Sequence, residues 1–182
     1  MGIVLLVLLV LVALWVMGVY NGLISLKNQV LNAWKQIDVQ LKRRHDLIPN
    51  LVNTVKGAME FERGTLEAVI SARAKALSAT GVAATAKAEG ELTHAVGKLF
   101  ALAENYPELK SSANVLQLQE ELGATENKIS FARQLYNDTA TQYNTKQAQF
   151  PTNLVAGLAK ASPAELWQIT DEGERAVPKV QL

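Results

Sequence analysis

Residues 115–143 read VLQLQEELGATENKISFARQLYNDTATQY and contain the most regular hydrophobic pattern in the chain. Apolar and small side chains recur there at steps of three and four, at Val115, Leu118, Leu122, Thr125, Ile129, Ala132, Tyr136, Ala140 and Tyr143. Such steps place side chains on one face of an α-helix, and a near-heptad repeat favours packing against other helices at crossing angles of about 20°. The stretch therefore predicts a long amphipathic helix whose apolar face is covered by other helices.

Three more amphipathic stretches precede this one. The first follows Leu23, Leu26, Val30, Ala33, Ile37 and Leu41, the second Ile48, Val52, Val55, Met59, Leu66, Val69, Arg73 and Leu77, and the third Leu92, Val96, Leu99, Ala103 and Tyr106. No run of alternating β-branched residues competes with these helical patterns. Four amphipathic helices joined by short loops predict an all-α fold, an antiparallel four-helix bundle, because this arrangement buries every apolar stripe.

Proline and glycine mark the expected helix boundaries. Pro49 lacks a backbone donor and clashes with the carbonyl group four residues earlier, so we expect a kink or a short break there. Residues 78–81, Ser-Ala-Thr-Gly, predict a turn, and residues 105–107, Asn-Tyr-Pro, predict the end of the third helix. Ser111 or Ser112 is a suitable N-cap for the fourth helix.

The fourth helix is expected to end at Phe150-Pro151. We expect a short helix over residues 152–158 and a brief turn over residues 165–169, followed by an extended tail over residues 176–182. The predicted organisation is thus a transmembrane anchor at residues 1–20, a helical bundle at 21–150, and a short helix with an extended C-terminal tail at 151–182.

The anchor prediction rests on residues 2–19, GIVLLVLLVLVALWVMGV, which contain no charged side chain. A helix of this length spans roughly 27–30 Å, the hydrocarbon thickness of a bilayer. Trp15 and Tyr20 lie towards its end, where aromatic rings favour the membrane interface. A cleaved signal peptide would need a basic leader, a shorter apolar run and a small-x-small cleavage site, so the pattern favours a retained single-pass anchor in the lipid bilayer.

Flanking charge predicts which side of the membrane holds the rest of the chain. Lys27 and Lys35 follow the apolar run, and nothing basic precedes it. The positive-inside rule therefore predicts a bacterial cytoplasmic (inner) membrane protein with its bulk in the cytoplasm. The exterior stays open as the alternative, because large domains can be translocated regardless of a few charges.

The sequence offers no recognisable catalytic constellation. It has no cysteine, no Gly-rich phosphate loop and no Gly-x-Ser-x-Gly motif. His45 and His94 are the two histidines, and Glu91 lies one helical turn before His94 without the further carboxylates that a metal site needs. We therefore expect a non-enzymatic protein without metal or cofactor.

Lys42-Arg43-Arg44-His45 is the densest basic cluster. It either pairs with acids of the fourth helix, such as Glu120, Glu121 or Glu126, or binds anionic lipid headgroups or another acidic ligand. Nucleic acid is not expected as a partner, because too few cations surround the cluster and the formal net charge of the chain is +1.

Polar residues also lie on or beside the apolar stripes, at Arg73, Asn127, Arg133, Asn137 and Asn144. The pairs Tyr136-Asn137 and Tyr143-Asn144 repeat at a spacing of seven, which gives them equivalent places along the helix. Polar groups next to a core need hydrogen-bond partners and then fix helix register. Packing specificity is one interpretation, and a polar ligand-binding interior is the other.

Several of these segments resemble the LemA family. The similarity is carried by Asn21-Gly22-Leu23, by residues 32–40 (NAWKQIDVQ, with Trp34 and Asp38), by residues 41–52 (LKRRHDLIPNLV), by residues 126–144 and by Phe150-Pro151. The resemblance covers essentially the whole chain. It implies a bacterial membrane protein with an N-terminal span and an up-and-down four-helix bundle, and it implies no known catalysis. Some relatives look like lipoproteins, which places the domain outside the cytoplasmic membrane, but this sequence lacks the required cysteine.

Three functions follow as hypotheses. The first is a membrane-anchored helical scaffold that binds membrane or envelope proteins, or copies of itself. The second is a membrane-tethered module that binds lipid or another ligand through Lys42 to His45. The third, a hydrolase or metalloenzyme, has the least support in the sequence.

Overall fold

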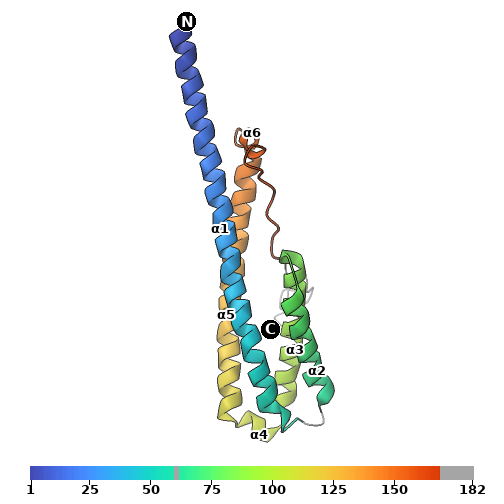
Figure 1. The fold of residues 1–182 in the computed structure, drawn as a ribbon. Helices are drawn as coiled ribbons and strands as arrows, with labels where there is room; N and C mark the ends of the chain where they lie inside the picture. Colours follow the sequence, from blue (N-terminus) through green and yellow to red (C-terminus); the bar gives the residue numbers. More distant parts are fainter. Residues whose placement is uncertain (60–61, 169–182) are drawn as a thin grey trace, which may run out of the picture. The chain divides into compact units, whose positions relative to one another are not determined.

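The computed structural model describes residues 1–59 and 62–168. These residues form six helices and contain no strand: α1 (Gly2–Lys56), α2 (Arg63–Ser78), α3 (Val82–Ala103), α4 (Pro107–Lys110), α5 (Ala113–Ala148) and α6 (Asn153–Ala156) (Figure 1). The all-helical prediction is confirmed. The chain divides into two compact units, one made of residues 1–37 and 132–166, the other of residues 38–131 with residues 167 and 168. We call them the anchor unit and the cluster unit.

α1 is a single helix of 55 residues that begins in the apolar run and continues past Tyr20. Its most apolar 18-residue window has a mean hydropathy of 3.0, and none of that window is buried against the rest of the chain. By length and composition this helix is able to cross a membrane. Trp15 and Tyr20, predicted at the membrane interface, are 41% and 40% exposed, which leaves both rings accessible to lipid.

The prediction of a break at Pro49 is wrong, because α1 runs through this residue to Lys56. A proline cannot donate to the carbonyl of the residue four positions earlier, here His45. The Nε of Arg73 donates a hydrogen bond of 2.7 Å to this carbonyl oxygen. The side chain from α2 thus supplies the donor that Pro49 lacks, and this bond stabilises the uninterrupted helix.

The real break lies further on, so the predicted second helix over residues 48–77 is wrong as one piece. α1 ends at Lys56, residues 57–59 form a turn that starts at Gly57, and α2 begins at Arg63. The spacing of the buried residues Val55, Met59 and Leu66 stays compatible with one helix across the turn, which hides it from the periodicity. Leu77, which we expected on the apolar face, is 55% exposed, and its neighbour Ala76 is buried instead.

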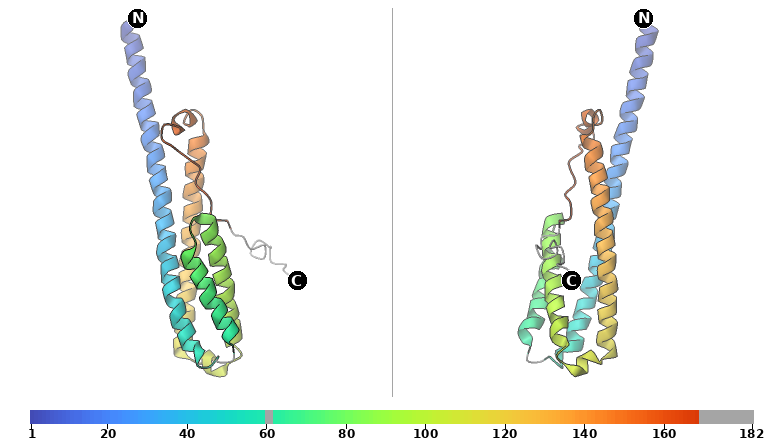
Figure 2. Two further views of the ribbon diagram at one scale, coloured as in Figure 1. Left: turned by 45° about the vertical axis from the view of Figure 1, so that its right-hand side comes forward. Right: turned by 180° about the vertical axis from the view of Figure 1, so that it is seen from behind.

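The cluster unit has one hydrophobic core. Buried side chains from the end of α1, from α2, α3 and α4 and from the start of α5 meet there, among them Leu51, Val69, Leu92, Leu109 and Leu122. α2 and α3 lie side by side and are joined by the predicted turn, in which Gly81 adopts a φ of +84° that favours glycine (Figure 2). The sequence did not reveal α4, a single turn that begins with Pro107.

In the anchor unit, the end of α5 lies beside the middle of α1 and runs in the opposite direction (Figures 1 and 2). Leu23 and Ile37 of α1 and Ala140 and Tyr143 of α5 are all buried. The rings of Trp34 and Tyr136 meet edge to face, with centroids 5.4 Å apart and an interplanar angle of 64°. This contact sets the register between the two helices.

Beyond α5, the predicted short helix is present as α6. The predicted turn at residues 165–169 is wrong for residues 165–168, the part of it that the structure describes. Residues 161–168 have no regular secondary structure. The reason is that α5 side chains bind the backbone of Ala164 and Glu165, as described below. Residue 169 and the predicted extended tail at 176–182 lie outside the described residues.

Candidate functional site

Among the residues that the structure describes, buried charged and ionisable side chains gather in the cluster unit, around Glu89 of α3. The side chain of Glu89 is 0% exposed. It occupies the apolar face of α3, because Leu92, Val96 and Leu99 follow it at helical spacing and are buried as well. A carboxylate in this position needs cationic or hydrogen-bonding partners, since burying an unpaired charge is very unfavourable.

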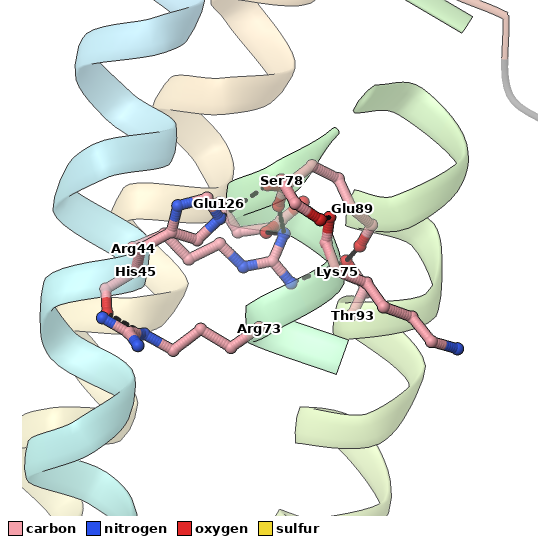
Figure 3. A network of polar contacts seen from close by, with 8 residues as sticks. All are labelled: Arg44, His45, Arg73, Lys75, Ser78, Glu89, Thr93 and Glu126. Carbon is pink, nitrogen blue, oxygen red and sulfur yellow. Dashed lines mark hydrogen bonds and ion pairs between the residues drawn. The ribbon is translucent and has the colours of Figure 1, made fainter. Parts of the chain in front are cut away.

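Two adjacent residues of α1 supply those partners (Figure 3). Arg44 Nη1 lies 3.2 Å from Glu89 Oε2, and His45 Nε2 lies 2.7 Å from Oε1. An ionised carboxylate only accepts hydrogen bonds, so the hydrogen of the second contact is on His45 Nε2. Arg44 and His45 are 4% and 7% exposed, which makes the whole contact buried.

The guanidinium of Arg44 has two further partners. Its Nη1 lies 3.2 Å from Glu126 Oε2 of α5, and its Nη2 donates to Thr93 Oγ1 at 2.7 Å. Thr93 in turn donates its hydroxyl hydrogen to the Glu89 carbonyl oxygen at 3.0 Å. The cluster therefore links α1, α3 and α5 through charge-assisted bonds, which are the stronger kind. Its groups satisfy one another, so the arrangement suits the fixing of helix register better than proton transfer to a substrate.

The structure divides the predicted basic cluster into two halves. Arg44 and His45 are buried in contact with Glu89, and we call these three residues, together with Thr93 and Glu126, the ionic cluster. Lys42 and Arg43 are exposed. Pairing with an acid of the fourth helix is confirmed for Arg44 and Glu126. We missed Glu89, although extending the stripe of the third helix back from Leu92 by one helical turn leads to it.

The other candidate ligands of α3 are solvated. Glu91 lies 3.2 Å from Lys75 Nζ in an exposed ion pair, and His94 is exposed. Residues 1–59 and 62–168 contain no group of three or more His, Asp or Glu side chains placed to hold a metal ion. An exposed pair of this kind contributes little to stability.

A second set of polar contacts lies in the anchor unit. Asn144 of α5 donates through Nδ2 to the Ala164 carbonyl oxygen at 2.8 Å and accepts from the Ala164 amide through Oδ1 at 2.7 Å. Tyr136 donates its hydroxyl hydrogen to the Glu165 carbonyl oxygen at 2.6 Å. These three bonds satisfy backbone groups that have no helix to bond them. Asn144 and Tyr136 therefore clamp the returning segment, 161–166, onto α5.

The remaining predicted polar positions differ in exposure. Arg133 and Asn137 are half-buried, and Asn127 is exposed. Trp34 is half-buried against Tyr136. Asp38 is largely exposed, yet partial desolvation raises the pKa of its carboxyl group.

Two tyrosines of α5 have perturbed ionisation. Burial, and second the negative charge of Glu165, raise the pKa of the Tyr136 phenol. Burial also raises the pKa of Tyr143. Both phenols therefore stay protonated to higher pH than free tyrosine, which preserves the hydrogen bond that Tyr136 donates.

A surface groove of about 820 Å³ lies in the cluster unit, between the last turns of α1 and the first turns of α2. Val52, Leu66 and Ile70 form its apolar wall, and Lys56, Arg63 and Glu67 are among its polar residues. None of the residues of the ionic cluster lines this groove.

Fold and site together define an all-helical protein with an N-terminal helix able to span a membrane. Its buried polar groups bond to one another and to the backbone of the same chain. The chain belongs to the LemA family, whose model matches residues 33–182. It is similar to Protein LemA of Metamycoplasma hominis, with 33% identity over 141 residues, or 76% of this chain and 64% of that protein. This chain thus matches slightly less than two thirds of that relative's length. It is also similar to the magnetosome proteins MamQ 1 and MamQ 2 of Paramagnetospirillum magneticum, each 23% identical over 189 residues, covering 90% of this chain and 70% of each relative.

Proposed function

We propose that this protein is a non-enzymatic, single-pass membrane-anchored scaffold that binds other membrane or envelope proteins, or further copies of itself, along its helices. The observation that carries the proposal is that the two ends of α1 differ in their surroundings. One end of this helix is apolar and uncovered, while the other contributes Leu51 and Val55 to a core. The same helix thus contributes both the proposed membrane span and part of the core of the cluster unit.

The ionic cluster supports a structural role over catalysis. Catalytic acids and bases need an accessible place for a substrate within hydrogen-bond reach. Glu89, Arg44 and His45 are all buried and contact one another, and the groove lies elsewhere. The cluster accordingly serves to fix the register of the helices that present the binding surface.

A candidate binding surface lies on the part of α5 that belongs to the cluster unit. Phe131 is 74% exposed there. Leu116 of the same helix is 52% exposed. Exposed aromatic and aliphatic side chains that gather on one face are typical of protein interaction sites.

The finer architecture belongs to this proposal. The four long helices form one antiparallel bundle, which buries all four apolar stripes. The bundle lies on the cytoplasmic side of a bacterial inner membrane, because Lys27 and Lys35 follow the span.

Site-specific photo-cross-linking tests the scaffold. A photoreactive amino acid replaces Phe131 in the full chain, and Lys98, an exposed residue of α3, receives the same replacement as a control. We expect discrete cross-linked species at position 131 in native membranes and none at position 98. Monomer alone at both positions, at every dose of light, contradicts the proposal.

Cysteine labelling tests the sidedness. The chain has no natural cysteine, and Ser78 and Ser162 are exposed, so single cysteines there leave the fold intact. We expect a membrane-impermeant thiol reagent to label them only after lysis. Labelling of intact cells with a permeable outer envelope would place the bulk outside.

A second candidate, a lipid- or ligand-binding module, is favoured by the exposure of Lys42 and Arg43. It retains only these two cations, because Arg44 and His45 are bound internally. Flotation of the domain lacking residues 1–20 with anionic vesicles, before and after Lys42→Glu and Arg43→Glu, decides the matter. Binding that the charge reversal abolishes would establish this function, and absence of binding by the unaltered domain would exclude the lipid version.

A further inference from the structure

The end of the anchor unit where α5 turns into α6 carries three exposed apolar side chains within nine residues. Phe150 is 79% exposed, Leu154 is 67% exposed and Leu158 is 71% exposed. Together they make this corner of the chain, residues 149–160, strongly apolar at its surface. Scattered single apolar residues are normal on a protein surface, but a cluster of this size calls for a partner.

The register between α1 and α5 places this corner along α1. The two helices are antiparallel in the anchor unit, and Trp34 faces Tyr136. Both helices rise about 1.5 Å per residue, so the residue fourteen positions after Tyr136 is level with the residue fourteen positions before Trp34. Phe150 is therefore level with Tyr20, where the apolar run of α1 ends.

The exposure of the side chains along α1 indicates the same position for the corner, independently of the helix register. The large side chains from Ile3 to Val12 are all at least 49% exposed, whereas Val16 and Val19 are half-buried and Leu23 is 1% exposed. Shielding of α1 within the anchor unit thus begins near Val16, about one helical turn inside the apolar run. Figure 1 shows α6 beside this part of α1.

The charge near the corner fits an anionic surface. Residues 139–164 contain Lys146 and Lys160 and no Asp or Glu, and Asp138 and Glu165 lie just outside this range. Lys146 and Lys160 are exposed. Lysines beside exposed apolar side chains are typical of elements that lie in the interface of a membrane with anionic lipids.

We propose that the corner at residues 149–160 is a second membrane contact, in which Phe150, Leu154 and Leu158 enter the headgroup region of the same bilayer that α1 spans. The two contacts hold the protein at two points and prevent α1 from tilting freely. This inference rests on the proposed membrane anchor, because the bilayer is at the right level only if residues 2–19 span it.

Fluorescence of single-cysteine variants tests this contact in the full chain. An environment-sensitive dye is attached to Leu154→Cys, to Leu135→Cys and to Leu9→Cys, and each protein is reconstituted in vesicles of phosphatidylcholine and phosphatidylglycerol. Leu135 is the matched control, since it is an exposed leucine of α5 level with residue 35, about 22 Å beyond Tyr20 along the helix axis. Nitroxide lipids quench the dye from a position either near the headgroup or deep in the chains.

We expect the dye at position 154 to show blue-shifted emission and severalfold stronger quenching by the shallow nitroxide than the dye at position 135. The dye at position 9 should be quenched most by the deep nitroxide. Quenching at position 9 with none at position 154 overturns this inference and leaves the anchor standing. Absence of quenching at position 9 overturns the anchor itself and the inference with it.

Two further outcomes separate lipid from protein as the occupant. Blue-shifted emission at position 154 that resists lipid quenching and grows with protein density assigns the corner to a second copy, and overturns the proposal. Replacement of Phe150 and Leu158 by serine, both exposed and therefore tolerant of the change, should reduce the quenching at position 154 in the proposed case. Quenching that this replacement leaves unchanged contradicts the role of the apolar side chains.

Discussion

Both the cluster unit and the anchor unit contain buried polar groups that need partners, but the partners differ in chemistry. In the cluster unit, helices pack on helices, and the buried polar groups are the ion pair of Glu89 with Arg44 and the bond of the same carboxylate to His45. In the anchor unit, α5 holds a segment without secondary structure, and the polar groups are the neutral side chains of Asn144 and Tyr136 bonded to backbone atoms. Helices satisfy their own backbone, which leaves side chains to fix register, whereas an irregular segment needs side chains to satisfy its amide and carbonyl groups.

The largest difference between the units should appear when Glu89 is removed. Glu89→Ala leaves Arg44 and His45 buried without their shared anion, so we expect a loss of about 3–5 kcal/mol in the free energy of unfolding. Chemical denaturation of the full chain in detergent micelles, followed by circular dichroism, measures it. The control is Glu91→Ala on the same helix, which removes only the exposed pair with Lys75 and should cost at most about 1 kcal/mol. Equal losses for the two variants would show that the cluster does not hold the unit together.

The next effect concerns Pro49 and Arg73. Arg73→Met removes the donor to the His45 carbonyl and should cost about 1.5–3 kcal/mol, the range for a hydrogen bond to a charged group. Pro49→Ala restores a backbone amide to the same carbonyl. The cost of Arg73→Met should therefore be smaller by about 1 kcal/mol in the Pro49→Ala background, as a double-mutant cycle measures. Additive costs would mean that Arg73 does not replace the missing amide.

A smaller effect is expected for the clamp of the anchor unit. Asn144→Ala removes both bonds to Ala164 and should cost about 1–2 kcal/mol, because each neutral hydrogen bond contributes about 1 kcal/mol. Hydrogen exchange of the Ala164 amide should accelerate, while amides of α3 keep their protection. Exchange that stays slow at Ala164 would show that the segment is held by other contacts.

The smallest effect is the pH dependence of Tyr136. Its pKa is raised in the folded protein, so this residue's contribution to stability is fully present below about pH 10, the unfolded pKa, and is lost as pH rises through the folded value. The difference in ultraviolet absorbance between wild type and Tyr136→Phe during alkaline titration reports this phenol alone. We expect its midpoint above about 10. A midpoint at or below that value contradicts the burial and the bond to Glu165.

Much of this could be predicted from the sequence, for identifiable reasons. Apolar spacing indicated the helices at residues 82–103 and 113–148, because burial of one face leaves a strong periodic signal. Gly81 marked the turn between α2 and α3, because its φ of +84° is one that glycine adopts readily. The turn at residues 57–59 escaped detection, since the buried residues Val55, Met59 and Leu66 keep a helical spacing across it.

Contacts between distant residues were harder to predict. Arg44 and Glu126 could be paired by charge, but Glu89 lies in an alanine-rich stretch and was not recognised. The role of Arg73 depends on the carbonyl of His45, which Pro49 leaves without its helical donor and which only the assembled helices bring within reach. The function of Asn144 depends on the path of residues 161–166, which have no periodicity of their own.

The central claim is that α1 is one helix whose first part lies in the bilayer and whose last part belongs to a packed domain. Washing of native membranes with alkaline carbonate tests it most directly, because this treatment releases peripheral proteins and leaves spanning ones in place. We predict that the intact chain stays in the membrane pellet and that a variant with Leu8→Lys and Leu9→Lys is released, since each lysine near the centre of a span costs about 3 kcal/mol. Recovery of the intact, unaltered chain in the supernatant would contradict the account.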